Sequence, residues 1–238
     1  MEVNELDRLI REQEGSWSLV FPALMRKVYV WMTLALVLTG ITAYGVASSP
    51  GLMMTIIQTP AIMWGLIIAE LAIVIAISAA INRLSLTTAT LLFVLYSVLN
   101  GATFSLIFAV YTMSSIANVF FITAGTFGVM AAYGYFTKRD LSSWGKLLLM
   151  ALIGLIIATL VNVFLVKSSG FDLILSYAGV LIFVGLTAYD TQKIKQMLAM
   201  QTDMGEGAQK VALLGALSLY LDFINLFLYL LRIFGRRE

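Results

Sequence analysis

Three acidic residues lie inside long apolar stretches of the sequence. Asp222 is near the middle of residues 211–233, Glu70 is at the centre of residues 61–81, and Asp190 is at the end of residues 173–192. An acid at bilayer depth is costly, so it normally faces protein or a water-filled cavity. No Lys or Arg lies deep in these stretches. Such carboxyls are protonated, share a proton, or hold a cation, and each state makes the site sensitive to pH.

The stretch that contains Asp222 has a single polar seam. Asn225 follows Asp222 by three residues, while Ser218 and Tyr229 continue the same helical face. The pattern predicts a helix that is surrounded by other helices and uses this seam as its working surface. Glu70 and Asn225 are therefore candidates for an ion path.

The composition is typical of a polytopic membrane protein. Of the 238 residues, 61% are hydrophobic and 12% are charged, and the mean hydropathy is +0.95. The absence of Cys and His excludes disulfides and thiol chemistry, and it removes the usual metal ligands. The cations are scattered at loop ends and the net charge is only +2, which argues against a nucleic-acid partner.

The hydropathy pattern predicts an all-α fold with seven membrane-spanning helices in one domain, residues 28–238, after a cytoplasmic tail of residues 1–27. Each predicted span is long enough to cross a bilayer, and a polar loop, residues 193–210, precedes the last one. Ala124 and Gly128 predict a close helix contact. The predicted spans are residues 28–47, 61–81, 86–111, 116–136, 147–166, 173–192 and 211–233.

The distribution of basic residues predicts a cytoplasmic N-terminus. In that orientation eleven of the fifteen Lys and Arg residues are cytoplasmic, and Lys167 alone is outside before the last helix. Arg232, Arg236 and Arg237 also lie outside if the last helix spans fully. A re-entrant last helix therefore stays an alternative.

Each acid also has a structural alternative. Asp222 and Glu70 could be protonated acids that hold helices together by hydrogen bonds. Asp190 could be an interfacial acid paired with Lys193, three residues further on.

Three segments of the sequence resemble the Bax inhibitor-1 family, also called the transmembrane Bax-inhibitor-motif family. They are GLTAYDTQKIK (residues 185–195), ALSLYLDFINLFLYLLRIFG (residues 216–235) and TKRDLSSWGKLLLMALIGLIIATLVN (residues 137–162), and the last is similar to the bacterial branch. The resemblance implies seven helices with the last one at the centre. It also implies a pH-sensitive Ca2+ leak across the membrane, which for a bacterial member is the plasma membrane.

The resemblance assigns roles to particular residues. Asp190 in TAYD and Asp222 in LYLDF match the aspartate pair that titrates, gates the pore and meets the metal ion. Arg83 is the nearest candidate for a basic latch to that pair, although the matching position, counted from Glu70, is Ile81. No cofactor is expected, because Ca2+ is the transported ion, and the lipid bilayer is the expected surrounding.

Two other functions stay open. The first is a regulator without transport, which binds a membrane protease or the stress and cell-death machinery. The second is an intramembrane aspartyl protease, suggested by Tyr189–Asp190. Asp222 follows Leu221 rather than a GxGD turn, and no Pro-Ala-Leu segment follows it, so we expect no enzyme activity.

Overall fold

The computed structural model describes the backbone of residues 3–236 and the side chains of residues 20–236. No strand occurs in residues 3–236, which confirms the all-α prediction. Seven helical segments are long and apolar enough to cross a membrane, as predicted. The helices are α1 (Val3–Ala47), α2 (Pro50–Gln58), α3 (Pro60–Ala80), α4 (Leu86–Phe104), the 3-10 helix η1 (Ser105–Ala109), α5 (Met113–Phe136), α6 (Ser142–Val161), the π-helical turn η2 (Asn162–Val166), α7 (Ser169–Ala199) and α8 (Glu206–Phe234).

Local sequence signals explain where several helices begin. Pro50 and Pro60 each occupy the first position of a helix, where a missing N–H is tolerated. The Ser85 hydroxyl accepts a hydrogen bond from Thr88 N at the start of α4, and Ser168 does the same for Phe171 N at the start of α7. These caps satisfy backbone donors that have no partner within the helix.

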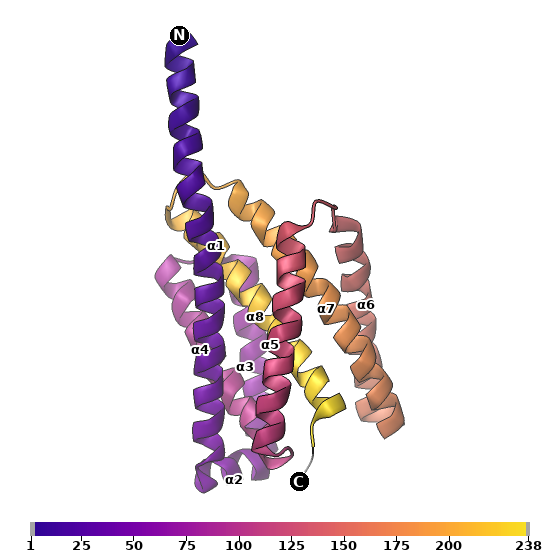
Figure 1. The fold of residues 1–238 in the computed structure, drawn as a ribbon. Coiled ribbons are helices and arrows are strands. Elements are labelled where there is room, and N and C mark those ends of the chain that lie inside the picture. The colour runs from indigo at the N-terminus through magenta and orange to yellow at the C-terminus, as the bar shows by residue number, and fades with distance from the viewer. Residues whose placement is uncertain (1–2, 237–238) are drawn as a thin grey trace.

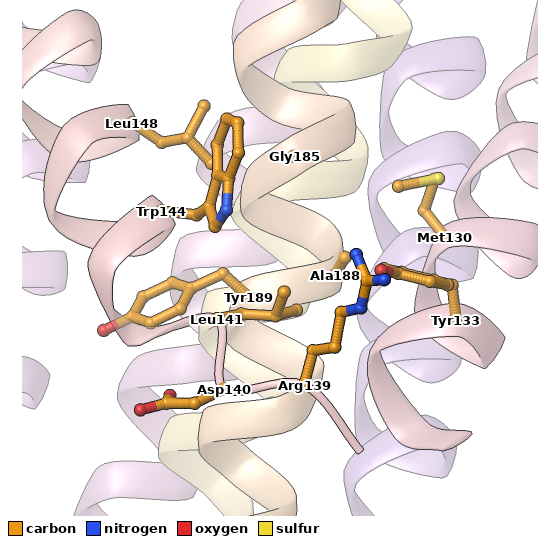
Figure 2. Close-up of a pocket in the computed structure, with 10 residues that line it drawn as sticks. All are labelled: Met130, Tyr133, Arg139, Asp140, Leu141, Trp144, Leu148, Gly185, Ala188 and Tyr189. Carbon is orange, nitrogen blue, oxygen red and sulfur yellow. The ribbon is translucent and has the colours of Figure 1, made fainter. Parts of the chain in front are cut away.

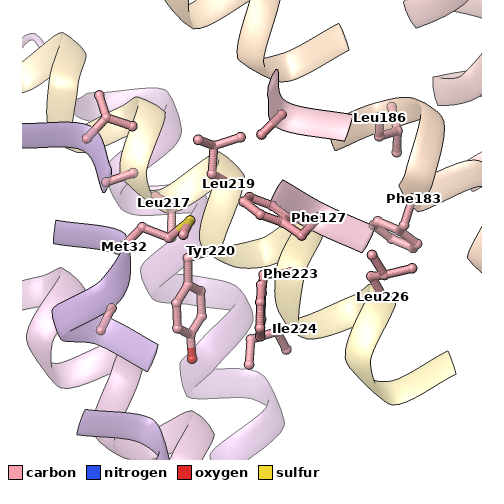
Figure 3. Packing of buried hydrophobic residues seen from close by; sticks show 14 of the residues in the cluster. Met32, Phe127, Phe183, Leu186, Leu217, Leu219, Tyr220, Phe223, Ile224 and Leu226 are labelled. Atoms are coloured by element: carbon pink, nitrogen blue, oxygen red, sulfur yellow. The ribbon is translucent and has the colours of Figure 1, made fainter. Parts of the chain in front are cut away.

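The last helix lies at the centre of the bundle. In its most apolar window 67% of the α8 residues are buried, against 11% to 39% in the other six spans. Helix α8 packs against α1, α4, α5 and α7, and Figure 1 shows it passing between them. Figure 3 shows Tyr220 and Phe223 of α8 packed among Met32 of α1, Phe127 of α5 and Phe183 of α7.

Helix α8 runs unbroken from one end of the bundle to the other. At the N-terminal end, the upper end in Figure 1, Glu206 Oε1 accepts a hydrogen bond from Leu86 N at 2.9 Å. At the C-terminal end, Arg236 O accepts from Thr112 N at 3.1 Å, and Ser115 Oγ accepts from Arg236 N at 2.8 Å. A continuous helix of 29 residues is about 43 Å long, which excludes a re-entrant hairpin in this segment.

The predicted loop of residues 193–210 is wrong in extent. Helix α7 continues to Ala199 and α8 begins at Glu206, so only residues 200–205 are outside helices. The added turns are held by packing, because Leu198 and Ala208 are fully buried, and Lys27 Nζ donates to Gln209 Oε1 at 2.9 Å. Hydropathy alone did not predict these turns, because polar residues alternate with the buried apolar ones there.

Two further details differ from the sequence-based expectation. Helix α2 forms at residues 50–58, between the first two predicted spans, where no helix was predicted. The close contact expected at Gly128 does not occur, since this glycine faces open space. Gly134 on the same helix packs directly against the Ala188 backbone of α7, so the close approach lies about two turns further along.

Candidate functional site

Asp222 is the most deeply buried acid of the described residues. Its side chain is 4% exposed, and its Oδ2 atom accepts no hydrogen bond from residues 20–236. The charge of the Asp190 carboxyl acts on it from the neighbouring helix α7. A buried carboxyl oxygen with no donor calls for a proton, a water molecule or a cation, because an unsatisfied charged group is costly.

The antiparallel register of α7 and α8 places the two aspartates about one turn apart in depth. A Cβ atom on Gly215 would lie 3.0 Å from Ile194 Cγ2, and one on Gly179 would lie 2.7 Å from the Tyr229 ring. If residues are counted along both helices between these two contacts, Asp190 lies at the depth of the residue about one turn before Asp222 on α8. This corresponds to an axial offset of ~5 Å between the two aspartates. Because α7 continues beyond Lys193 to Ala199, Asp190 lies further from the end of the helix than the predicted loop at residue 193 implied.

The basic residue that acts on Asp190 is Lys193, one turn further along α7. Lys193 does not form an ion pair with Asp190 among the described side chains, and its Nζ lies 6.0 Å from the centroid of the Tyr189 ring. Asp190 is partly exposed, in contrast to Asp222. The pair therefore has one solvent-accessible acid and one buried acid, with a cation nearby but not in contact.

Arg83 and Glu70, two of the other predicted site residues, form no hydrogen bond or ion pair with the aspartates among the described side chains. Arg83 is exposed after the end of α3, and it is not among the charged groups that act on either aspartate. Glu70 accepts hydrogen bonds from Thr103 Oγ1 and, at 3.4 Å, from Asn100 Nδ2. The structure therefore joins Glu70 of α3 to α4 and does not bring it to the aspartates.

Asn225 is also satisfied locally. Its Nδ2 atom donates to the Leu221 carbonyl oxygen, one turn earlier on α8, at 2.8 Å. Its Oδ1 atom is a further acceptor.

No group of three or more Asp and Glu side chains in the described part of the chain could hold a metal ion together. Ca2+ commonly takes six to eight oxygen ligands. The two aspartates alone supply an incomplete and weak cation site.

Two residues that the sequence analysis did not single out hold the end of α7 against the end of α5 and the α5–α6 loop. Gln192 Nε2 donates to Arg139 O and Gln192 Oε1 accepts from Leu141 N, both at 2.8 Å. Lys195 Nζ donates to Tyr135 O at 2.7 Å, where a cation is favoured at the C-terminal end of α5. The only sequence signal for this contact was Gln192, a polar residue within one turn after Asp190.

The fold and this site define a multi-pass α-helical membrane protein in which Asp222 of the central helix α8 is acted on by Asp190 of α7. The family model "Inhibitor of apoptosis-promoting Bax1" matches residues 22–238. The inner membrane protein YbhL of Escherichia coli K12 is 53% identical over 215 residues, which cover 90% of this chain and 92% of that protein. A protein of Borreliella burgdorferi is 44% identical over 226 residues, or 95% of this chain and 97% of the relative.

A membrane protein of Streptococcus pyogenes serotype M1 is 40% identical over 183 residues, which cover 77% of this chain and 78% of the relative. The chain therefore belongs to the Bax inhibitor-1 family, and its bacterial relatives confirm the resemblance to the bacterial branch.

Proposed function

We propose that the protein is a pH-sensitive Ca2+ leak whose gate is the pair Asp190 and Asp222. The observation that carries this proposal is the buried Asp222 carboxyl, which has an oxygen without a hydrogen-bond donor and is acted on by Asp190. A pair of acids with no cation in direct contact changes its total charge as pH changes.

At low pH the pair holds a proton, and the closed arrangement of α7 and α8 is stable. As pH rises the pair loses this proton, and two negative charges then repel each other. For two unit charges ~5–8 Å apart in an effective dielectric constant of ~20, such repulsion is on the order of 2–3 kcal/mol. That energy favours separation of α7 and α8 at the N-terminal end of the bundle, and the ionised carboxylates attract Ca2+.

Glu70 and Asn225 are proposed as further contacts along the ion path. Both offer hard oxygen atoms, which suit Ca2+. Glu70 is half-buried and its hydrogen-bond partners, Thr103 and Asn100, are uncharged. Several weak sites allow an ion both to enter and to leave, which conduction requires.

We infer that the N-terminal end of the bundle faces the cytoplasm. The positive-inside rule supports this orientation, because basic residues gather at that end. Together with the name of the Escherichia coli relative, it supports the plasma membrane of a bacterium as the location. Lys167, Arg232 and Arg236 lie at the opposite end, while the cations of the N-terminal end are Arg26, Lys27, Arg83, Lys138, Arg139, Lys146, Lys193, Lys195 and Lys210.

The test is Ca2+ flux into liposomes that contain the purified protein, measured between about pH 5 and pH 8. We expect flux that rises with pH in the parent protein and loses this dependence in Asp190→Asn. Flux no greater than that of empty liposomes at every pH would contradict the proposal.

One observation favours a regulator of a membrane protease or another membrane protein as the second candidate. The first part of α1 extends beyond the ends of the other helices in Figure 1, so the other described helices leave this part uncovered. Residues 193–210 give less support, because most of this segment is helical and its residues Ile194, Leu198 and Ala208 are buried. Co-purification of a protease with a protein that shows no flux would favour this candidate.

A further inference from the structure

A cavity of about 310 Å3 lies between α5 and α6 at the N-terminal end of the bundle (Figure 2). Its outer part is lined by Tyr133, Arg139 and Trp144, and its inner part includes Met130, Leu148 and Ala188. The charged and amphipathic side chains are thus at the end of the bundle, and apolar side chains lie deeper. This order matches the change from headgroups to hydrocarbon in one leaflet of a bilayer.

The cavity is open because α5 and α6 each pack extensively on α7 and have no comparable contact with each other. Their outward side chains are apolar and exposed, such as Phe136 at 75% and Leu147 at 53%. Such surfaces face lipid in a membrane protein. The cavity therefore opens toward the lipid of the adjoining leaflet.

The charge at the mouth of the cavity is positive. Arg139 lines the cavity, and Lys138 precedes it in the same loop; both are exposed and form no ion pair among the described side chains. Asp140 opposes them, but its Oδ1 accepts a hydrogen bond from Ser142 N at 2.9 Å. The hydrogen bonds from Ser142 hold the pKa of Asp140 below its ordinary value, so this carboxyl stays ionised.

The Asp140 carboxylate does not occupy the same side of the loop as the Arg139 guanidinium. Figure 2 shows Arg139 directed toward Tyr133, while Asp140 points away from it. The loop thus carries two cations and one acid, and Arg139 is the cation that lines the cavity. Basic pockets between transmembrane helices are typical binding places for anionic lipid headgroups.

We propose that this cavity binds one anionic phospholipid, whose phosphate meets Arg139 and whose first acyl carbons lie on Met130, Leu148 and Ala188. The planar guanidinium of Arg is well suited to phosphate. The volume is at the low end of the range for small-molecule pockets, ~300–1,000 Å3. It therefore accepts a headgroup and the start of a chain, while the rest of the lipid stays in the bilayer.

Trp144 lines the cavity and makes the proposal testable by fluorescence quenching. The other three tryptophans are changed to Phe (Trp17, Trp31 and Trp64), so that Trp144 is the only indole. The full-length protein is placed in bilayers of phosphatidylcholine with a small fraction of lipid brominated near the headgroup. The brominated lipid is either phosphatidylglycerol or phosphatidylcholine at the same fraction.

We expect brominated phosphatidylglycerol to quench Trp144 with about fivefold higher apparent affinity, as expected for one Arg near a phosphate. Arg139→Gln should remove this preference. Lys138→Gln is the matched control, because it removes the same charge from the same loop at a residue that does not line the cavity. It should keep most of the preference.

Equal quenching by both brominated lipids in the parent would overturn the proposal. So would an equal loss in Lys138→Gln and Arg139→Gln, because this result indicates a diffuse charge effect. Relief of quenching by soluble glycerol phosphate would point to a headgroup site without a bound lipid chain. Helical circular dichroism checks each variant, and if Arg139→Gln does not fold, Leu148→Phe tests the inner part of the cavity by filling it.

Discussion

Replacing Asp222 with Asn tests the proposed gate most directly. Asn has nearly the shape of a protonated aspartic acid but cannot ionise, so the pair carries one negative charge at most. The repulsion of on the order of 2–3 kcal/mol between two carboxylates is then absent. Because 1.4 kcal/mol corresponds to a factor of ten, the bias toward the open state at high pH falls roughly 30- to 140-fold.

The sign of the pH effect follows from the carboxyl chemistry. A carboxyl loses its proton as pH rises, so repulsion within the pair grows with pH and the parent's Ca2+ flux rises. In Asp222→Asn the flux should stay close to the parent's value at about pH 5 across the whole range to about pH 8. The assay is Ca2+ entry into liposomes that contain an indicator dye, with equal protein in each sample.

Asp203→Asn is the matched control for this experiment. Asp203 is an exposed acid in the α7–α8 connection, and its Oδ1 accepts a hydrogen bond from Gly205 N at 2.8 Å, which Asn can also accept. This variant should keep the parent's pH profile. The reasoning is refuted if Asp222→Asn follows pH as the parent does, or if Asp203→Asn loses the dependence to the same degree.

Two further predictions concern stability, measured as thermal unfolding in detergent. Gly134→Ala should lower the free energy of unfolding by roughly 1–3 kcal/mol, because its new Cβ would collide with the Ala188 backbone. Gly128→Ala is the control and should have little effect, because that position is open. Equal effects of the two substitutions would contradict the α5–α7 contact at Gly134. Arg232→Gln should lower the free energy of unfolding by at most about 1 kcal/mol. The ion pair between Arg232 and Asp172 has an N–O distance of 3.6 Å, and each of the two side chains is 39% exposed. A larger loss, or one unaffected by added salt, would show that this pair does more than a surface ion pair.

Buried polar contacts between helices were beyond the reach of the sequence. Tyr220 on α8 hydrogen bonds with Thr39 on α1 at 2.7 Å, and Thr39 Oγ1 also lies 2.9 Å from the Ser97 carbonyl of α4. Nothing in the spacing of these residues pairs them, because they are separated by more than fifty positions. Only the packing of α8 among its neighbours selects these partners.

The apolar runs by themselves determined that this chain is an all-α membrane protein with seven spans, because a bilayer admits only segments whose backbone hydrogen bonds are satisfied internally. They also placed Asp222 on a helix that had to be surrounded by protein. Tertiary structure alone decided the depth of Asp190, since that depth depends on the register of α7 against α8. It likewise decided that Gly134 rather than Gly128 meets α7, because hydropathy records how apolar a helix is and not which of its faces a neighbour covers.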